Sequence, residues 1–331
     1  METLLDIQNL HVSYRVYRGY LKVLDGVSFT VNKGERVGLV GEAGGGKTTM
    51  MKTILRILPD QVSKIDQGRI LFKGQDILQM GGAALQKVRS QGIAMIFQDP
   101  TSALNPVFTV GEQLSDVIHY SLDSRTSRRE KGQTIKQVAM QALKEVSMPD
   151  QARIMGTYPI QLSGGMRQRV CISMAITTSR ELLIADEPGT SLDVTIQDQI
   201  LRLLHELVRQ RNTSIILITH SLGVARQMTD RIYVMYAGTM VETARASELF
   251  ANPLHPYTLA LLASVPKLTG GGIARGIPGR LPDYLNPPVG CRFSPRCPRA
   301  TPVCEVSPPP FFDLGQEHKV ACYLFQEDEH D

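Results

Sequence analysis

Hydrophobic and polar positions alternate along the first forty residues, in the runs LLDIQNLHVSY, KVLDGVSFTV and ERVGLVG. Alternation with a period of two, interrupted by Gly, Asp and Asn, predicts antiparallel strands that lead into a buried strand, RVGLV. The later apolar runs GIAMIFQ, LLIADE and SIILITH predict further buried strands, and DVTIQDQILRLLHELVRQR places its apolar residues at helical spacing. Strands that alternate with helices predict a mostly parallel α/β sheet.

The same pattern suggests how the chain is divided. Between Gln98 and Gly164 it is predominantly helical, and beyond about Ala251 it becomes rich in proline and loop-like. We therefore expect a main domain over residues 1–250, with a helical subdomain inserted at about 99–165, and a small Cys- and Pro-rich extension over residues 251–331. No internal repeat is visible, so we expect one nucleotide-binding unit.

A glycine-rich run, GEAGGGKTT, separates the buried strand RVGLV from the helical run KTTMMKTILRIL. Strand, loop and helix form the context of a phosphate-binding P-loop, in which backbone N–H groups and the helix N-terminus bind phosphate. An ordinary glycine turn before a helix is the alternative. In a P-loop, Lys47 reaches the β/γ-phosphate oxygens and Thr48 binds Mg²⁺. The expected ATP-binding residues of the loop are Gly41, Glu42, Ala43, Gly44, Gly45, Gly46, Lys47, Thr48 and Thr49.

Polar residues end the other predicted core strands: Gln98 after MIF, Asp186 and Glu187 after LLIA, and His220 after LIT. Ligands of parallel α/β sheets bind beyond the carboxyl ends of the strands. We expect Asp186 to bind Mg²⁺, usually through water, and Glu187 to act as general base on the attacking water. His220 is expected to contact the γ-phosphate, and Gln98 to join the catalytic and Mg²⁺-binding group. An acidic helix cap and a structural histidine are the alternatives for these residues.

A second glycine turn, QLSGGMRQRV, opens another predicted helix. Its residues Ser163, Gly164 and Gly165 provide a second anion-binding helix N-terminus. One nucleotide needs only one glycine-rich cradle, so we expect this turn to contact the γ-phosphate of ATP held in the P-loop of another subunit. The expected assembly is a dimer that holds two ATP molecules between its subunits.

The order GEAGGGKTT, FQ, LSGGMRQRV, LLIADEP, SLDV and LITH resembles the ATP-binding-cassette (ABC) ATPases over about Leu5 to Leu249. The resemblance implies a P-loop NTPase (RecA-like) core with an N-terminal antiparallel β subdomain and an inserted helical subdomain. It also implies that Asp193 lies in a loop at the dimer interface and that Tyr14 stacks on adenine. Tyr17 and Tyr20 are the other candidates for that stacking.

Three longer segments, IFQDPTSALNPVFTVGEQL, NPLHPYTLALLASVP and NPPVGCRFSPRCPRATPVC, are similar to the dipeptide/oligopeptide importer ATPases. The resemblance implies a second ATPase subunit, commonly a different chain, two membrane-spanning permeases and an external solute-binding protein. The region after Gln98 would receive a helix of a permease. In that subfamily serines are frequent where this chain has Ala43 and Gly45, and threonine is usual where it has Gly189.

The expected function is therefore ATP hydrolysis that powers the import of a small solute. Di- or oligopeptides are the expected solutes. One alternative is a soluble ABC-type ATP switch in DNA repair or translation, and another is a catalytically inactive assembly partner. A third is an importer subunit for nickel or another non-peptide solute.

Composition narrows the setting. The 331 residues are 42% hydrophobic and 21% charged, with a net charge of +4 that is too small to indicate nucleic-acid binding. No apolar run approaches the ~20 residues that span a bilayer. The N-terminus lacks the basic start and apolar stretch of a secretory signal. We expect a peripheral protein on the cytoplasmic face of the inner (plasma) membrane, in contact with the membrane through its partners.

Of the five cysteines, Cys171 lies in the apolar run RVCISMAI and is expected in the core. The other four are separated by five, six and seventeen residues in the last fifth of the chain. In a reducing compartment such a group of cysteines indicates metal or redox chemistry more than disulfide bonds. The chain has no CxxC pair among them, which argues against a zinc ribbon. The resemblance implies a [4Fe–4S] cluster, with zinc or free thiols as alternatives, on Cys291, Cys297, Cys304 and Cys322.

Overall fold

The computed structural model describes residues 2–121, 128–265 and 276–326. The chain forms two compact units, Met1–Gln79 together with Leu217–Asp331, and Met80–Ile216. The boundary between them falls within one strand, β8 (Ser214–Thr219).

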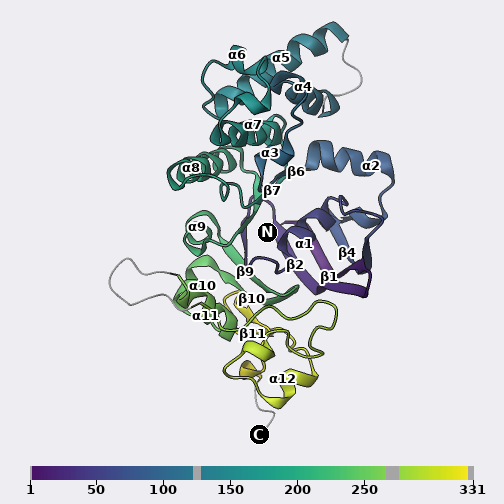
Figure 1. Cartoon of the computed structure of the whole chain (residues 1–331), viewed down its shortest axis with the longest axis vertical. Coiled ribbons are helices and arrows are strands. Elements are labelled where there is room, and N and C mark those ends of the chain that lie inside the picture. Colours follow the sequence, from purple (N-terminus) through teal and green to yellow (C-terminus); the bar gives the residue numbers. More distant parts are fainter. Residues whose placement is uncertain (1, 122–127, 266–275, 327–331) are drawn as a thin grey trace. The chain divides into compact units, whose positions relative to one another are not determined.

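An antiparallel sheet in the first unit is built from the alternating N-terminal runs (Figure 1). Its strand order is β2-β1-β4-β5, and β1 pairs with both β2 and β4. Every one of the apolar residues Leu5, Ile7, Leu10 and Val12 of β1 is buried, which is why this pattern fixes the register. The predicted N-terminal antiparallel β subdomain is confirmed. Its strands are β1 (Thr3–Val16), β2 (Gly19–Asn32), β4 (Ser63–Phe72) and β5 (Gln75–Asp76).

The strands of a second sheet in this unit follow the order β11-β12-β10-β9-β3. The predicted buried strand β3 runs parallel to β9, and β9 and β10 form an antiparallel pair. Helix α1 follows the P-loop, and three helices follow β8 and β10. The bounds are β3 (Arg36–Val40), α1 (Lys47–Ile54), α9 (Leu222–Met228), β9 (Arg231–Tyr236), β10 (Thr239–Arg245), α10 (Ala246–Ala251), α11 (Pro256–Ala263), α12 (Pro302–Val306), β11 (Phe312–Asp313) and β12 (Lys319–Val320).

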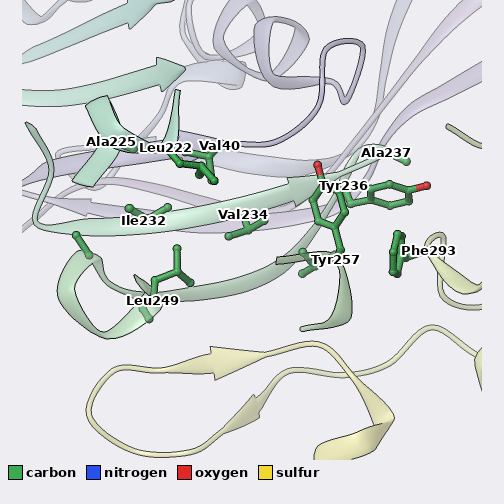
Figure 2. Close-up of a cluster of buried hydrophobic side chains, with 13 residues drawn as sticks. Val40, Leu222, Ala225, Ile232, Val234, Tyr236, Ala237, Leu249, Tyr257 and Phe293 are labelled. Atoms are coloured by element: carbon green, nitrogen blue, oxygen red, sulfur yellow. The ribbon is translucent and has the colours of Figure 1, made fainter. Parts of the chain in front are cut away.

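Three aromatic side chains at one end of this sheet form the centre of a hydrophobic core (Figure 2). The ring centroid of Tyr236 lies 4.7 Å from that of Tyr257 and 5.0 Å from that of Phe293. All three side chains are almost completely buried. Phe293 comes from the Cys- and Pro-rich segment, in which no hydrophobic periodicity predicts a core position. The segment therefore packs as part of the first unit, and its stability comes from a core that it shares with β9 and α11.

A buried carboxylate also anchors the C-terminal part of the chain. Glu242, on β10, is fully buried and accepts hydrogen bonds from the backbone N–H groups of Leu254 and His255, each at 2.9 Å. Its other partner is the His318 ring, with Nε2 at 2.8 Å from the carboxylate. Buried charges are tolerated where they are paired and hydrogen-bonded, and here the pairing ties the turn before β12 to β10.

The second unit contains two parallel strands, β6 and β7, and a group of helices. Figure 1 shows α4, α5, α6 and α7 gathered together, so the predicted inserted helical subdomain is confirmed, while its exact limits stay a prediction. The bounds are α2 (Gly82–Lys87), β6 (Ile93–Ile96), α3 (Pro100–Ala103), α4 (Val110–Ser121), α5 (Arg128–Glu145), α6 (Gln151–Met155), α7 (Gly164–Ile176), β7 (Leu182–Asp186) and α8 (Val194–Arg211).

Candidate functional site

The glycine-rich loop of the first unit lies between β3 and α1, as the sequence predicted. Gly46 is the residue before the helix and has a left-handed backbone, with φ of 97°. Gly41 has φ of 153°, and a Cβ there would lie 2.1 Å from the carbonyl oxygen of Met235. Both positions therefore require glycine. The Lys47 ammonium is buried and donates to the carbonyl oxygens of Gly41 and Glu42, at 2.8 Å each.

Three side chains from outside the loop hold its first half. Arg296 forms two hydrogen bonds with the Glu42 carboxylate, at 2.8 and 3.0 Å. The Tyr257 hydroxyl oxygen accepts from the Glu42 N–H at 2.8 Å, and the Tyr284 hydroxyl donates to the Gly44 carbonyl at 2.6 Å. Hydrogen bonding to Glu42 raises the pKa of Arg296, so the guanidinium stays charged. Sequence reasoning missed all three residues, because the HPYTL, PDYL and SPRC runs that contain them carry no recognised loop-binding pattern.

The three tyrosines considered for adenine stacking differ in their surroundings. Tyr14 is half-buried on β1, and Tyr17 is fully exposed. Tyr20 lines a cavity of about 330 Å³, together with Lys22 and Leu24, and Tyr14 does not. A Cβ on Gly46 would lie 3.0 Å from the side chain of Leu24, one of the residues that line this cavity. Of the three tyrosines, Tyr20 is the one that lines this particular cavity.

His220 belongs to the same unit, directly after β8, and its side chain is exposed. Thr48 and Thr49 lie in the first turn of α1, at the end of the helix that faces the P-loop. These positions agree with a phosphate-binding helix N-terminus, since the first N–H groups of a helix have no partner within the helix.

Within the second unit, two of the predicted catalytic residues touch. The Gln98 amide donates to the Glu187 carboxylate, with 3.1 Å between Nε2 and Oε2. Asp186, the last residue of β7, is buried, and Glu187 follows it with φ of 46°. A left-handed backbone at a non-glycine residue is strained by about 1 to 3 kcal/mol and persists where its surroundings fix it. The Glu187 carbonyl oxygen accepts from the N–H groups of Gly189 and Thr190, which holds this turn.

The residues predicted to act across a dimer also come together in the second unit. Ser163 caps α7, its hydroxyl oxygen accepting from the Met166 N–H at 3.3 Å, and Asp193 caps α8 by accepting from Ile196 at 3.0 Å. A Cβ on Gly165 would lie 2.7 Å from the Ile196 side chain. Gly164 is close to Leu192 in the same way. The glycine turn and the Asp193 loop therefore pack against each other, each at the N-terminus of a helix.

Gly189 stands where threonine is usual in the importer ATPases that this chain resembles, and the structure shows a side chain packed against it. A Cβ at this position would lie 2.8 Å from Cγ of Gln197 on α8. The Gln197 side chain thus occupies the space that a larger residue 189 would need. Gly45 is a milder departure, because a Cβ there would lie 3.0 Å from the Glu42 carbonyl oxygen and the backbone is not left-handed.

The four C-terminal cysteines line one small cavity of about 40 Å³, together with His255 and Phe293. Burial raises the pKa of the Cys291 thiol to about 11, and burial also raises the pKa values of Cys297 and Cys322. All five cysteines are free thiols. Within residues 2–121, 128–265 and 276–326, no group of three or more His, Cys, Asp or Glu side chains is arranged to hold a metal ion. The four thiols thus share one cavity, and a metal centre on them stays a prediction.

The P-loop, the strand-end carboxylates and the second glycine turn define an ATP-hydrolysing P-loop cassette. Sequence comparison agrees: the profile of the ABC transporter family matches residues 24–190, and that of the oligopeptide/dipeptide transporter C-terminal region matches residues 241–304. The chain belongs to the ABC transporter family, as an ATP-binding subunit with the C-terminal region of the oligopeptide/dipeptide transporters.

Individual relatives are similar over almost the whole chain. The dipeptide transport ATP-binding protein DppD of Bacillus subtilis is 43% identical, over 98% of this chain and 95% of that protein. The oligopeptide transport ATP-binding protein OppD of Haemophilus influenzae is 42% identical, over 93% of each chain. A solved dimeric ATP-binding cassette in a post-hydrolysis state, bound to ADP and phosphate, matches with a TM-score of 0.64 and 25% identity, over 73% of this chain and 98% of that one.

No helix in the described part of the chain is both long and apolar enough to cross a membrane.

Cys171 lies in the core, as predicted, with 8% of its surface exposed.

Proposed function

We propose that this chain is the ATPase subunit that powers the import of di- or oligopeptides through a pair of membrane-spanning permeases. The observation that carries the peptide class is the match of residues 241–304 to the C-terminal region of oligopeptide/dipeptide transporters. Similarity to dipeptide and oligopeptide transport proteins over nearly the full chain supports it. The alternatives, a soluble ATP switch, an inactive partner and an importer of nickel or another solute, have no comparable support.

The proposed partners are a second ABC ATPase, which is commonly a different chain, two permease subunits and an external solute-binding protein. In this assembly the protein is peripheral on the cytoplasmic face of the inner membrane. The apolar side chains Val107, Phe108 and Ile160 are exposed in the second unit, and we assign this region to contact with a permease helix. Val107 and Phe108 are adjacent in the chain, and a group of exposed apolar residues is typical of protein interfaces.

The proposed reaction is hydrolysis of ATP to ADP and phosphate. The loop Gly41–Thr49 binds the phosphates through backbone N–H groups, and Lys47 contributes a positive charge at the β/γ oxygens. Thr48, Asp186 and Gln98 would hold Mg²⁺, which neutralises charge on the phosphates. Hydroxyl, carboxylate and amide oxygens are the ligands that Mg²⁺ prefers.

Glu187 accepts a proton from the attacking water, and Gln98 orients its carboxylate through the 3.1 Å hydrogen bond. His220 contacts the γ-phosphate. In the dimer, Ser163, Gly164, Gly165 and Asp193 of one protomer meet the ATP that the P-loop of its partner holds. Loss of the γ-phosphate contact then loosens the dimer, which couples hydrolysis to permease movement. Adenine stacks on Tyr14. Tyr20, which lines a cavity, is the alternative.

We also propose that Cys291, Cys297, Cys304 and Cys322 hold a [4Fe–4S] cluster, with zinc as the alternative. All four line one cavity, which fits a shared ligand set. The role of the cluster would be structural or one-electron redox.

Peptide uptake tests the transport function. In a strain that lacks this gene, uptake of a labelled dipeptide should be lost, restored by the wild-type chain and not restored by Lys47→Ala. Co-purification from detergent-solubilised membranes should recover two permease subunits. Normal dipeptide uptake without the gene would refute the peptide assignment. Iron and zinc analysis of anaerobically purified protein, with its visible absorption, tests the cluster; a colourless protein with stoichiometric zinc would refute it.

A further inference from the structure

Arg296 is immobilised against the P-loop. Its two terminal nitrogens bind the two carboxylate oxygens of Glu42, at 2.8 and 3.0 Å, a bidentate geometry that is among the strongest for a charged pair. The remaining contacts go to the carbonyl oxygens of Pro278 and Ile277, at 2.8 and 3.1 Å, and to the Tyr236 hydroxyl at 3.2 Å. Only 5% of the Arg296 side chain is exposed. The guanidinium therefore has little freedom to leave Glu42.

Glu42 carries a negative charge inside a loop whose task is to bind a triphosphate. A carboxylate close to phosphate oxygens opposes their binding, and the repulsion is larger where the surroundings exclude water. About a quarter of the Glu42 side chain is exposed, so solvent screens it only in part. The bidentate pair with Arg296 cancels this charge and directs the carboxylate toward the C-terminal extension.

The extension also fixes the backbone of the loop. Tyr284 donates to the Gly44 carbonyl at 2.6 Å, and the side chain of Leu281 would lie 3.5 Å from a Cβ on Gly44. Gly44, Gly45 and Gly46 follow one another, and a run of glycines has much conformational freedom to lose on ordering. Contacts from residues 277–296 thus hold a loop that its own sequence leaves unusually free.

We propose that Arg296 is a positioning residue of the ATP site: it neutralises Glu42 and, with Tyr284, holds the loop in its phosphate-binding form. The C-terminal extension then contributes directly to nucleotide affinity. This rests on the phosphate-binding role proposed above for the loop Gly41–Thr49.

The position of Arg296 in the chain links this contact to the cysteine cavity. Arg296 ends the short 3₁₀ turn Ser294–Arg296, between Cys291 and Cys297. The Cys297 N–H donates to the Ser294 carbonyl at 3.2 Å, and the Cys291 N–H donates to the Cys304 carbonyl at 2.8 Å. A change at these thiols therefore moves the turn that carries Arg296. Coupling between two binding sites is reciprocal, so ATP in the loop also stabilises the backbone around the cysteines.

Equilibrium binding of ATP to the full-length protein, with Mg²⁺ and before turnover, tests the proposal. Arg296→Ala should weaken ATP binding on the order of tenfold, a size typical of coupled sites. Adding Glu42→Gln to Arg296→Ala should recover most of that loss, because it removes the charge that Arg296 neutralises. Arg280→Ala is the matched control, since Arg280 is an exposed arginine of the same segment and should leave the affinity unchanged.

Removing the unpaired Glu42 charge could also restore stability. Thermal unfolding therefore separates the two explanations: the proposed role predicts a weaker ATP affinity in an Arg296→Ala protein whose unfolding midpoint stays close to that of wild type. An Arg296→Ala affinity within twofold of wild type, or a loss that Glu42→Gln does not recover, would overturn the proposal. If Arg296→Ala does not fold, Tyr284→Phe and Arg296→Lys take its place, and each should weaken ATP binding more than Arg280→Ala does. A wild-type protein that binds no ATP would refute the proposed function instead.

Amide hydrogen exchange over residues 291–304 tests the link to the cysteine cavity. Saturating ATP should slow exchange in this segment of the wild-type protein. In Arg296→Ala, at ATP concentrations that saturate the variant, exchange in the same segment should no longer respond to ATP. An equal response in both proteins would show that the loop and the cavity are not coupled through Arg296.

Discussion

The amide of Gln98 holds the carboxylate of Glu187, with 3.1 Å between the donor and acceptor atoms. The two residues are 89 positions apart, and they meet because β6 and β7 are parallel neighbours that end at the same edge. The backbone of Glu187 is left-handed, at φ of 46°. Side chain and main chain are thus both fixed at the residue proposed to take a proton from water.

Glu187→Gln should slow ATP hydrolysis by about 10² to 10⁴-fold, the usual contribution of a general base, while ATP binding persists. The glutamine keeps the shape of the side chain and its hydrogen-bond acceptor, so the turn should survive. Single-turnover hydrolysis and size-exclusion chromatography with ATP measure both effects, and an ATP-trapped dimer is expected. Glu206→Gln, at an exposed position of α8, is the control. Turnover at the wild-type rate would remove Glu187 as the base.

Two glycine-to-alanine changes should have opposite effects on stability. Gly41→Ala places a Cβ 2.1 Å from the Met235 carbonyl oxygen on a left-handed backbone, and should lower the free energy of unfolding by at least ~2 kcal/mol. Gly223, inside α9, has open space around its Cβ direction, so Gly223→Ala should raise that free energy by about 0.4 to 1 kcal/mol. Urea unfolding measures both. Equal stability of the two variants would contradict the described loop geometry.

His318→Ala should destabilise the protein by about 1 to 3 kcal/mol, because it removes a buried hydrogen-bond partner from the fully buried Glu242 side chain. The neighbouring Lys319→Ala is the control. The Lys319–Asp313 pair, at 3.1 Å, is about half exposed on both sides, so its loss should cost less than ~1 kcal/mol. Thermal unfolding of both variants gives the comparison. Similar losses for the two would show that Glu242 does not depend on His318.

Cys171 should resist thiol reagents in the native protein. Burial, with a smaller effect of the Asp99 charge, raises the pKa of this thiol to about 12, and only the thiolate reacts. Treatment with iodoacetamide at pH 8, followed by mass spectrometry of the peptides, should leave Cys171 unmodified until guanidinium unfolds the chain. Rapid native labelling at this residue would mean that α7 opens readily.

Much of the fold could be predicted because local pattern and burial agree. The alternation in LLDIQNLHVSY matches a strand with one buried face, and each apolar core run became β3, β6, β7 or β8. The residues of the P-loop could be identified because glycine, lysine and threonine at that spacing are required by phosphate chemistry. Motifs of this kind depend on few positions, all close in the chain.

The contacts that hold the site could not be predicted in the same way. Arg296 and Glu42 are 254 positions apart, and nothing near either residue marks it as a partner of the other. Phe293 lies in a run of prolines and cysteines, where no periodicity indicates a core position. Gln197 opposite Gly189 is also invisible until the helix is placed. Such pairs are set by tertiary packing, which overrides what a local stretch of sequence favours.

The two short strands near the C-terminus have a consequence for any shortened form of the protein. β12 pairs with β10 and β11 pairs with β12, so together they cover a sheet edge that would otherwise offer bare peptide groups to another chain. A version that stops before Phe312 would expose the edge of β10. It would also lack His318, which contacts the buried Glu242 carboxylate. We therefore expect such a truncation to aggregate through the exposed edge of β10.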